Sequence, residues 1–191
     1  WLRAALDLTR KQNELFWDEE KGGYFDTSGK DSSILVRMKE QYDGAEPAGN
    51  SIAAMNLLRL SAMTDNNDWK EKALKTITAC GDVLSRAPFS MPQMVSAFGL
   101  SNAKLKQIVI AGERNDEMVR RMSREVWSRY LPDKFILLAD ESAATREVFG
   151  AESFVQSLTR IAGKTTVYVC EDYVCQLPTT DINVFIKQLG K

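Results

Sequence analysis

The chain of 191 residues contains no histidine and only three cysteines, and these shortages exclude several kinds of catalytic and metal site. Without histidine, the chain by itself cannot form Ser-His or Cys-His catalytic pairs or a histidine-ligated metal centre. Three cysteines are too few for a four-cysteine zinc site. We therefore expect no metal and no cofactor. Any catalysis would depend on carboxylates, arginines, lysines, tyrosines and two cysteines that lie close together in the sequence.

A strong net charge and long apolar runs are lacking as well. The net charge is -1, and 44% of the residues are hydrophobic, which is typical of a soluble globular protein. No apolar run approaches the roughly 20 residues that span a bilayer, and no targeting segment is visible. We expect neither nucleic acid nor membrane as a partner, and the compartment stays open. The chain begins with Trp1 in a helical pattern, so we expect a longer protein whose missing N-terminal part is a partner.

Residues 1–103 are predicted to be mainly helical, with one inserted β-hairpin. Apolar residues recur at helical spacing over 2–16, 48–62, 68–84 and 92–102. An Asp68 capping box is expected to start the third helix, and Pro92 suits the first turn of the fourth. Two short strands, 22–27 and 34–38, are predicted on either side of a polar turn. Four helices cannot close a helical toroid, so we expect an exposed apolar face. We expect Leu2 to Phe16 and the helix that carries Met55 and Leu58 to be less protected than the α/β unit from Ile108 onward.

Residues 104–191 are predicted to form a small α/β unit. Buried strands at 106–112 and 134–140 enclose a helix at 115–130, which predicts parallel strands with a right-handed crossover. Strands at 165–170 and 174–177 flank a tight turn, and a last helix covers 181–189. The first strand ends in glycine before a helix, as phosphate loops do, but GxGxxG and a P-loop lysine are missing. The predicted class is α+β: a partial (α/α) toroid of about four helices with a β-hairpin insertion, followed by a small C-terminal α/β unit.

The loop from Tyr42 to Ser51 is the first candidate site. It compresses Asp43, Glu46, two glycines, a proline and Asn50 into a segment that ends where a helix begins. Glycine and proline can hold Asp43 and Glu46 in a defined place, as acid/base catalysis requires. Short polar residues at helix starts also act as caps. Catalytic and capping roles therefore both stay open for the two acids, and Arg37 could pair with either of them.

An aromatic-rich stretch, Phe16 to Asp26, is the second candidate site. Sugar sites place aromatic rings against apolar C–H faces and carboxylates near hydroxyl groups, and a glycosidase needs two carboxyls across the scissile bond. The predicted binding residues are Trp17, Tyr24, Arg37, Tyr42 and Asn50. The alternative is that the rings pack onto the helices while the charges face water.

Cys170 and Cys175 form a candidate redox pair. If a four-residue loop joins their strands, they lie directly opposite each other and a disulfide is geometrically allowed. With the two-residue turn Glu171-Asp172 they would be diagonal, and the lack of glycine there favours the longer loop. We predict free thiols that close under oxidation.

Several stretches resemble one known family. They are 16–26, 34–40, 42–47, 49–51, 167–170 and 175–178, and they resemble the spermatogenesis-associated protein 20 family. The resemblance implies a thioredoxin-like domain followed by an (α/α)6 toroid of the six-hairpin glycosidase and sugar-epimerase type. It places the thioredoxin-like domain and the first toroid hairpins outside these residues, with 1–103 as the C-terminal hairpins. Sugar epimerases of this shape use histidines, which this chain lacks.

Two hypotheses of function follow. In the first, the chain is part of a toroid protein that binds or processes a carbohydrate, with Asp43 and Glu46 at the toroid mouth and a small sugar as ligand. In the second, it is a non-catalytic scaffold that docks a thioredoxin-like domain or another protein, and the acids only cap helices. Whether the chain is an enzyme stays open.

Overall fold

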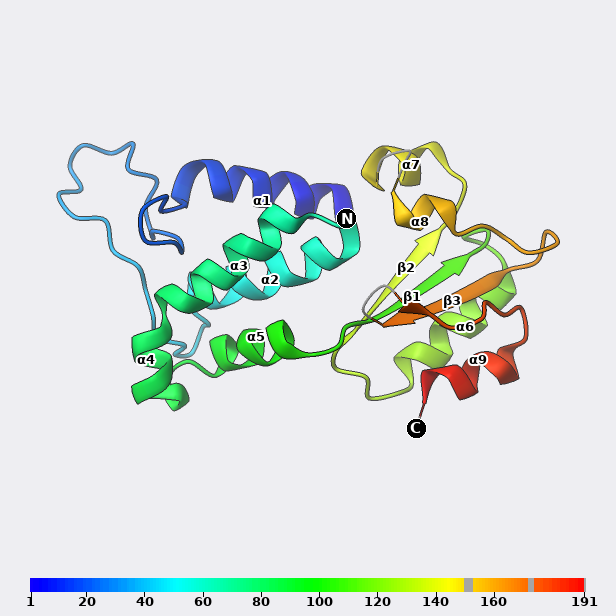
Figure 1. Ribbon diagram of the computed structural model, residues 1–191. Coiled ribbons are helices and arrows are strands. Elements are labelled where there is room, and N and C mark those ends of the chain that lie inside the picture. The colour runs from blue at the N-terminus through cyan, green and yellow to red at the C-terminus, as the bar shows by residue number, and fades with distance from the viewer. Residues whose placement is uncertain (150–152, 172–173, 191) are drawn as a thin grey trace. The chain divides into compact units, whose positions relative to one another are not determined.

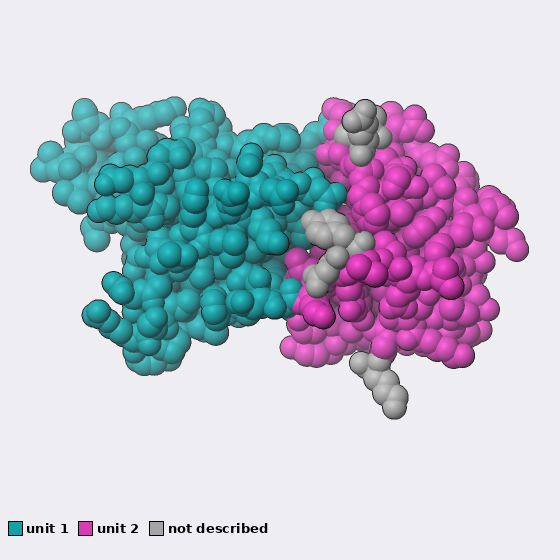
Figure 2. Space-filling model, viewed as in Figure 1, with its two compact units in different colours: residues 1–103 teal, residues 104–191 magenta. Residues whose placement is uncertain are grey.

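The chain folds into two compact units, unit 1 (Trp1–Ala103) and unit 2 (Lys104–Lys191), coloured separately in Figure 2. The computed structural model describes residues 1–149, 153–171 and 174–190 (Figure 1). Helices and a mixed sheet together confirm the predicted α+β class. Within the described ranges, no helix has the length and apolarity needed to cross a membrane.

Unit 1 is helical, and its central helix is α2. Its elements are α1 (Leu2–Phe16), α2 (Gly49–Thr64), α3 (Asn67–Ala79), α4 (Gly81–Arg86), the short 3-10 helix η1 (Pro88–Ser90) and α5 (Pro92–Asn102). α2 packs closely against both α3 and α5. Met55 and Leu58 are buried, at 8% and 4% exposure, whereas Ile52 of the same helix is 39% exposed. The lower amide protection of this helix stays a prediction.

The start and end of α3 differ from the prediction. Asn66, not Asp68, is the N-cap, because its side chain accepts the Trp69 N–H at 3.0 Å. The predicted single helix also divides at Cys80, where α3 ends and α4 begins. Pro92 opens α5 as expected, since proline lacks the N–H that the first helical turn leaves unpaired.

The β-hairpin predicted at 22–27 and 34–38 does not form. Gly22 and Gly23 have φ of 71° and 76°, which interrupts an extended strand, and the only bridge in this stretch pairs Trp17 with Tyr24. One backbone hydrogen bond, from Asp26 N–H to the Met38 carbonyl at 2.8 Å, joins the two predicted strands. The apolar residues of the second strand lie at the surface, including Leu35 at 94% exposure.

Unit 2 is built on a mixed sheet with the order β2-β1-β3-β4. Its elements are β1 (Lys106–Ala111), α6 (Glu117–Trp127), β2 (Lys134–Ala139), α7 (Ala143–Phe149), α8 (Phe154–Ser157), β3 (Thr166–Glu171), β4 (Val174–Cys175) and α9 (Ile182–Leu189). β1 and β2 are parallel, as predicted, whereas β3 is antiparallel to β1 and β4 to β3. The position of β3 beside β1 was not predicted.

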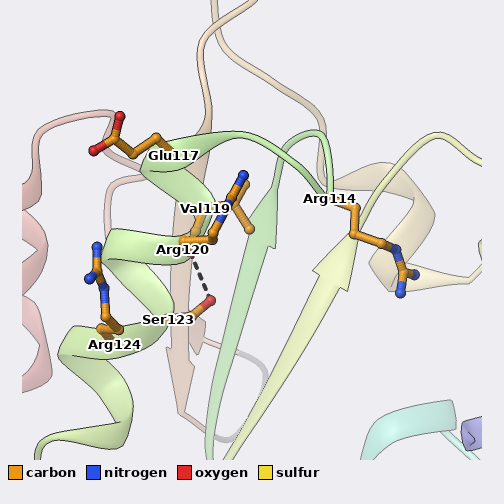
Figure 3. Close-up of a pocket in the computed structure, with 6 residues that line it drawn as sticks. All are labelled: Arg114, Glu117, Val119, Arg120, Ser123 and Arg124. Carbon is orange, nitrogen blue, oxygen red and sulfur yellow. Dashed lines mark hydrogen bonds between the residues drawn. The ribbon is translucent and has the colours of Figure 1, made fainter.

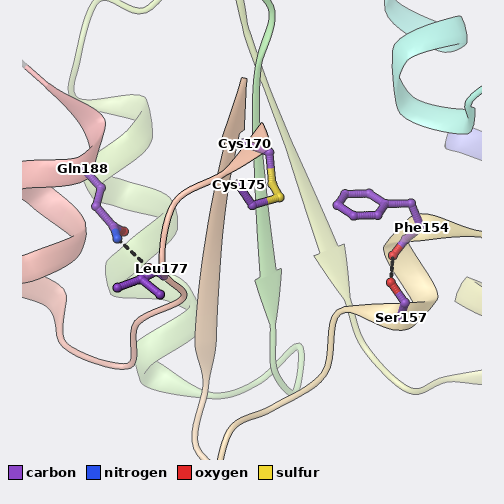
Figure 4. Close-up of a disulfide and its surroundings, with 6 residues drawn as sticks. All are labelled: Phe154, Ser157, Cys170, Cys175, Leu177 and Gln188. Carbon is purple, nitrogen blue, oxygen red and sulfur yellow. Dashed lines mark hydrogen bonds between the residues drawn. A yellow bond between two sulfur atoms is a disulfide. The ribbon is translucent and has the colours of Figure 1, made fainter. Parts of the chain in front are cut away.

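One hydrophobic core joins α6 and α9 to the sheet. It contains Ile108, Ile110, Val119, Met122, Val126, Val167, Val169, Phe185 and Leu189. α8 contacts β2, and Figure 4 shows it on the side of the sheet opposite α6 and α9. A β-α-β unit followed by a helical segment, an antiparallel hairpin and a final helix, in this strand order, is the topology of the thioredoxin fold.

Candidate functional site

The Asp43 carboxylate joins the starts of two helices. Its Oδ1 accepts the Ala48 N–H at 2.8 Å, just before α2. Its Oδ2 accepts the N–H groups of Gln93 and Met94, at 2.8 and 3.2 Å, in the first turn of α5. The residue is 8% exposed. Both oxygens thus satisfy N–H groups that helix starts leave unpaired, which is the capping role considered above. The catalytic role of Asp43 stays a prediction.

The other two candidates of this loop, Glu46 and Tyr42, lie at the surface. Glu46 is exposed, and its carbonyl accepts the Gly44 N–H at 3.1 Å. Tyr42 is 62% exposed. Because Asp43 is buried and Glu46 is not, the two carboxylates occupy different environments. A paired acid and base would need to face one shared cavity.

Three of the predicted sugar-binding residues form a buried cluster. Asn50 accepts the Tyr24 N–H at 2.7 Å and donates to the Tyr24 carbonyl at 2.9 Å. The Tyr24 hydroxyl donates to Asn13 Oδ1 at 2.6 Å, and burial raises its pKa. Trp17 packs edge-to-face on Tyr24 at 5.2 Å, with Lys72 Nζ 3.9 Å from the Trp17 ring. The cluster fastens the aromatic stretch to α1 and α2.

Arg37 and its neighbour Lys39 also hold the long loop. Arg37 lies 3.9 Å from the Phe25 ring and donates from Nε and Nη2 to the Thr27 carbonyl, at 3.0 and 2.6 Å. These bonds replace the pairing with Asp43 or Glu46 that we considered. Lys39 forms an ion pair with Asp18 at 2.7 Å, with side chains 16% and 11% exposed.

The Asp18–Lys39 pair was missed in the sequence. The hydrogen bond from Lys39 lowers the pKa of Asp18 to about 2, and the Lys21 and Glu20 N–H groups act in the same direction. The two residues are 21 positions apart and lie on either side of the predicted hairpin strands, 22–27 and 34–38. No local sequence pattern indicates a pair over that distance.

A pocket of about 300 Å³ lies beside the buried cluster. It is lined by Gln12, Phe16, Tyr24, Phe25, Asp26, Gly49 and Asn50. Two predicted binding residues, Tyr24 and Asn50, therefore contribute to it. Asp26, which accepts the Glu40 N–H at 3.2 Å, supplies its carboxylate. Gln12 was not predicted, because it lies on α1 and comes next to the pocket residues of the loop and of α2 only once the chain has folded.

A second hollow of unit 1 is an apolar groove between α1 and α2. Its volume is about 620 Å³, and it is lined by Trp1, Leu2, Ala5, Leu8, Thr9, Gln12, Asn56, Arg59, Leu60 and Met63. Leu8 is 71% exposed and Trp1 is 108% exposed, so the α1 wall is mostly uncovered. This groove fits the predicted exposed apolar face.

In unit 2, a crevice of about 320 Å³ lies where β1 and β2 end. It is lined by Gly112, Glu113, Arg114, Ala139, Asp140, Glu141, Ser142 and Arg160. Ligands of open α/β sheets bind at this edge, but here the charged groups bind one another. Arg114 contacts Asp140 at 3.3 Å, and Arg160 contacts Glu113 at 3.0 Å and Glu141 at 3.4 Å. In the described part of the chain, no three His, Cys, Asp or Glu residues are placed to hold a metal ion.

Asp140 and Gly112 both line this crevice. Burial acts to raise the pKa of Asp140, but hydrogen bonds from Ser142, Thr145 and Arg114 outweigh it and lower the pKa. At Gly112, a Cβ would lie 2.7 Å from Val119 Cγ2 and 2.8 Å from Thr165 Oγ1. The loop that Gly112 opens, 112–116, contains no cysteine. It is the place where a Cys-x-x-Cys motif would accompany a β-α-β unit in a redox protein.

A groove of about 640 Å³ follows α6 and is rich in arginine. Arg114, Glu117, Val119, Arg120, Ser123 and Arg124 line it (Figure 3). Arg114 points away from Arg120 and Arg124 in this view, toward the Asp140 side. Arg120 donates to the Asn115 carbonyl at 2.6 Å. The arginines therefore do not converge on one point.

Cys170 and Cys175 form a disulfide (Figure 4). They lie directly opposite each other in the β3–β4 pair, and Glu171 lies opposite Val174, so both end residues of the expected four-residue loop belong to the strands instead. The prediction of free thiols is wrong, because this register places the two side chains next to each other on neighbouring strands. The predicted turn residues Asp172 and Tyr173 lie outside the described residues. Cys80 is a free, buried cysteine.

The chain is therefore an α+β protein of two units. Comparison with known proteins indicates the family that it resembles. The chain is 38% identical to human spermatogenesis-associated protein 20 over 185 residues, and 37% identical to the rat protein. Both matches cover 95% of this chain but 23% of the relative. An uncharacterized protein of Caenorhabditis elegans is 26% identical over 182 residues. The predicted resemblance to the spermatogenesis-associated protein 20 family is thereby confirmed. No family model matches the chain, and no solved structure does.

Proposed function

We propose that unit 1 is one side of a larger helical domain, and that further helices of a longer chain cover the groove between α1 and α2. The observation that carries this proposal is the uncovered apolar wall of α1. Only Leu6 and Thr9 of its 15 residues are buried, while Leu8 is 71% exposed. Burying a leucine side chain is worth roughly 1.5–3 kcal/mol, so a covering helix would stabilise α1 considerably.

The helices that would cover this groove are expected in the rest of a longer chain. This chain spans 23% of the length of its human and rat relatives, so a protein of their length has many more residues that could supply helices. An (α/α) toroid is one architecture in which each helix is covered by a neighbour. In this reading, α2, α3 and α5 form one packed side, and the groove accepts the next helices.

The test is binding to the part of the human relative that this chain does not match. We expect the 191-residue protein to bind it, and Leu8→Glu to abolish binding without unfolding unit 1. Leu74, on α3, is 41% exposed and lies outside the groove, so Leu74→Glu is the matched control. Calorimetry and size-exclusion chromatography measure the complex. Absence of binding, or equal loss in both variants, would contradict the proposal.

A second candidate function is binding of a small carbohydrate in the pocket of about 300 Å³. Its lining combines the Phe16 and Phe25 rings with the Gln12 amide and the Asp26 carboxylate. Pockets of this kind use apolar walls with a few polar groups to orient a ligand. Here Asp26 and Gln12 would bind hydroxyl groups, while Asp43 keeps the helix starts in place.

Titration with mono- and oligosaccharides, followed by NMR shifts, tests this second candidate. Asp26→Asn and Gln12→Ala are expected to weaken binding, and Glu46→Gln, at an exposed position outside the pocket, is expected to leave it unchanged. If no sugar shifts the pocket resonances, or if Glu46→Gln weakens binding as much as Asp26→Asn, the candidate is wrong.

A further inference from the structure

The disulfide of unit 2 lies away from the crevice at the ends of β1 and β2. β3 is antiparallel to β1, so Cys170 lies opposite Gln107, near the start of β1, whereas Gly112 follows the end of that strand. The loop 112–116 has no cysteine. A unit with the topology of the thioredoxin fold therefore carries a disulfide at the other end of its sheet, on the β3–β4 hairpin (Figure 4).

The two bonded cysteines differ sharply in exposure. Cys170 is 1% exposed, whereas Cys175 is exposed and lies on the edge strand β4. Its neighbours Val174 and Leu177 are 74% and 86% exposed. Thiol–disulfide exchange requires a thiolate to reach one sulfur while the other leaves. Cys175 is therefore the more exposed residue of this bond.

We propose that the Cys170–Cys175 disulfide is a thiol-exchange site, reduced by a protein dithiol that attacks Cys175 Sγ. The bond between Cys175 and Cys170 breaks, and Cys170 leaves as a thiolate and takes a proton. The second thiol of the dithiol then attacks the dithiol sulfur that is bonded to Cys175, and Cys175 leaves as a thiol. The dithiol is oxidised to a disulfide and unit 2 gains two electrons and two protons.

Reduction changes the hairpin and leaves the core intact. β4 has two residues, paired as Cys170–Cys175 and Glu171–Val174. The segment after β4 is fastened separately: the Gln188 side chain donates to the Leu177 carbonyl at 2.7 Å, and Thr179 pairs with Val167 (Figure 4 shows the Gln188 contact). Loss of the disulfide therefore removes the covalent link between β3 and β4, while these anchors, the bond from Gln176 N–H to the Val169 carbonyl at 2.9 Å and the packing of α9 on the sheet remain.

The first experiment reduces the native protein with millimolar dithiothreitol and labels it with a maleimide. We expect one label per chain, on Cys175, identified by peptide mass spectrometry. Cys80 is an internal control, because it is 2% exposed and burial raises the pKa of its thiol to about 11. Cys170 and Cys80 should become labelled only after unfolding in urea. A disulfide that resists reduction until the protein unfolds would overturn the proposal, as would labelling of Cys170 first.

The second experiment identifies the attacked sulfur. A thioredoxin variant whose second active-site cysteine is replaced by serine cannot complete the exchange, so it should remain bonded to Cys175. Cys80→Ser should still form this mixed disulfide, and Cys175→Ser should not. Circular dichroism of Cys175→Ser checks that the variant is folded. A mixed disulfide on Cys170, or none with the folded wild-type protein, contradicts the assignment.

Discussion

Helices α1 and α6 are both amphipathic, yet they bury their apolar sides to very different extents. The 11 residues of α6 contribute three side chains to the unit 2 core, Val119, Met122 and Val126. The 15 residues of α1 bury only Leu6 and Thr9. An amphipathic pattern predicts that a helix has a side to bury, but the pattern does not supply the surface that covers it.

The two units differ in how completely each covers the apolar sides of its own helices. In unit 2, the sheet and α9 supply the covering surface within 88 residues of chain, Lys104–Lys191. In unit 1, α2 is covered by α3 and α5, but α1 lies across a groove. The four predictions below test this difference, and amide hydrogen exchange reports on each unit separately.

The largest effect is expected at Phe185 in the core of unit 2. Phe185 is 0% exposed and packs with both α6 and the sheet. Phe185→Ala should lower the free energy of unfolding of unit 2 by about 3–5 kcal/mol, because it removes a large buried ring and leaves a cavity. Exchange of the Ile108 and Ile110 amides measures the loss. A change below about 1 kcal/mol would show that the core repacks or is incomplete.

The next effect concerns Asp43 in unit 1. Asp43→Ala removes a carboxylate that accepts three N–H bonds, and we expect a loss of about 2–3 kcal/mol, since hydrogen bonds to charged groups are the stronger ones. Exchange of amides in α2 and α5 measures it. Glu46→Gln is the control, because Glu46 is exposed. Equal, small effects of the two substitutions would contradict the stabilising role of Asp43 at the two helix starts.

A smaller, pH-dependent effect is expected at Asp18. Its pKa is about 2, below the ordinary 3.8, so ionised Asp18 stabilises the fold above that ordinary pKa. This stability should be lost as the pH falls from about 4 toward 2, on the order of 1 kcal/mol. Lys39→Met removes the main cause, so the pKa of Asp18, followed by carboxyl NMR, should move up toward 3.8. An unchanged pKa in that variant would contradict the ion pair.

The smallest effect is expected at Leu8. Leu8→Ala should change the stability of the isolated protein by no more than about 0.5 kcal/mol, because the side chain is 71% exposed. Exchange of the α1 amides should also be faster than that of β1 in the unmodified protein. A loss approaching that of Phe185→Ala would mean that something in this chain covers α1, and the contrast between the units would disappear.

Local patterns predicted the elements whose partners lie nearby in the sequence. Pro92 indicated the start of α5, and the apolar runs around α6 predicted the parallel pair β1–β2. Asp181 and the pattern behind it predicted α9. For the candidate site, Tyr24 and Asn50 were predicted to bind a sugar, and they contact each other as parts of a buried cluster. Their sugar-binding role stays a prediction.

Features that depend on distant partners were not predictable. Asp43 accepts N–H groups 50 and 51 residues further along the chain, so its partners follow from how α5 packs. The register of β3 on β1 joins residues such as Gln107 and Cys170. The failed hairpin has a local cause instead. Ile34 to Met38 has strand-like composition, but Gly22 and Gly23 adopt positive φ and remove the strand that would pair with it.

The tight packing around Gly112 has a consequence for protein design. A cysteine at this position would place its Cβ within 3 Å of Val119 Cγ2 and Thr165 Oγ1, so these side chains would have to shift. A redox motif grafted onto unit 2 would therefore have to begin at Glu113 or later, in the loop before α6. The thioredoxin-like topology of unit 2 can thus serve as a scaffold for sulfur chemistry at its crevice only if the glycine is kept.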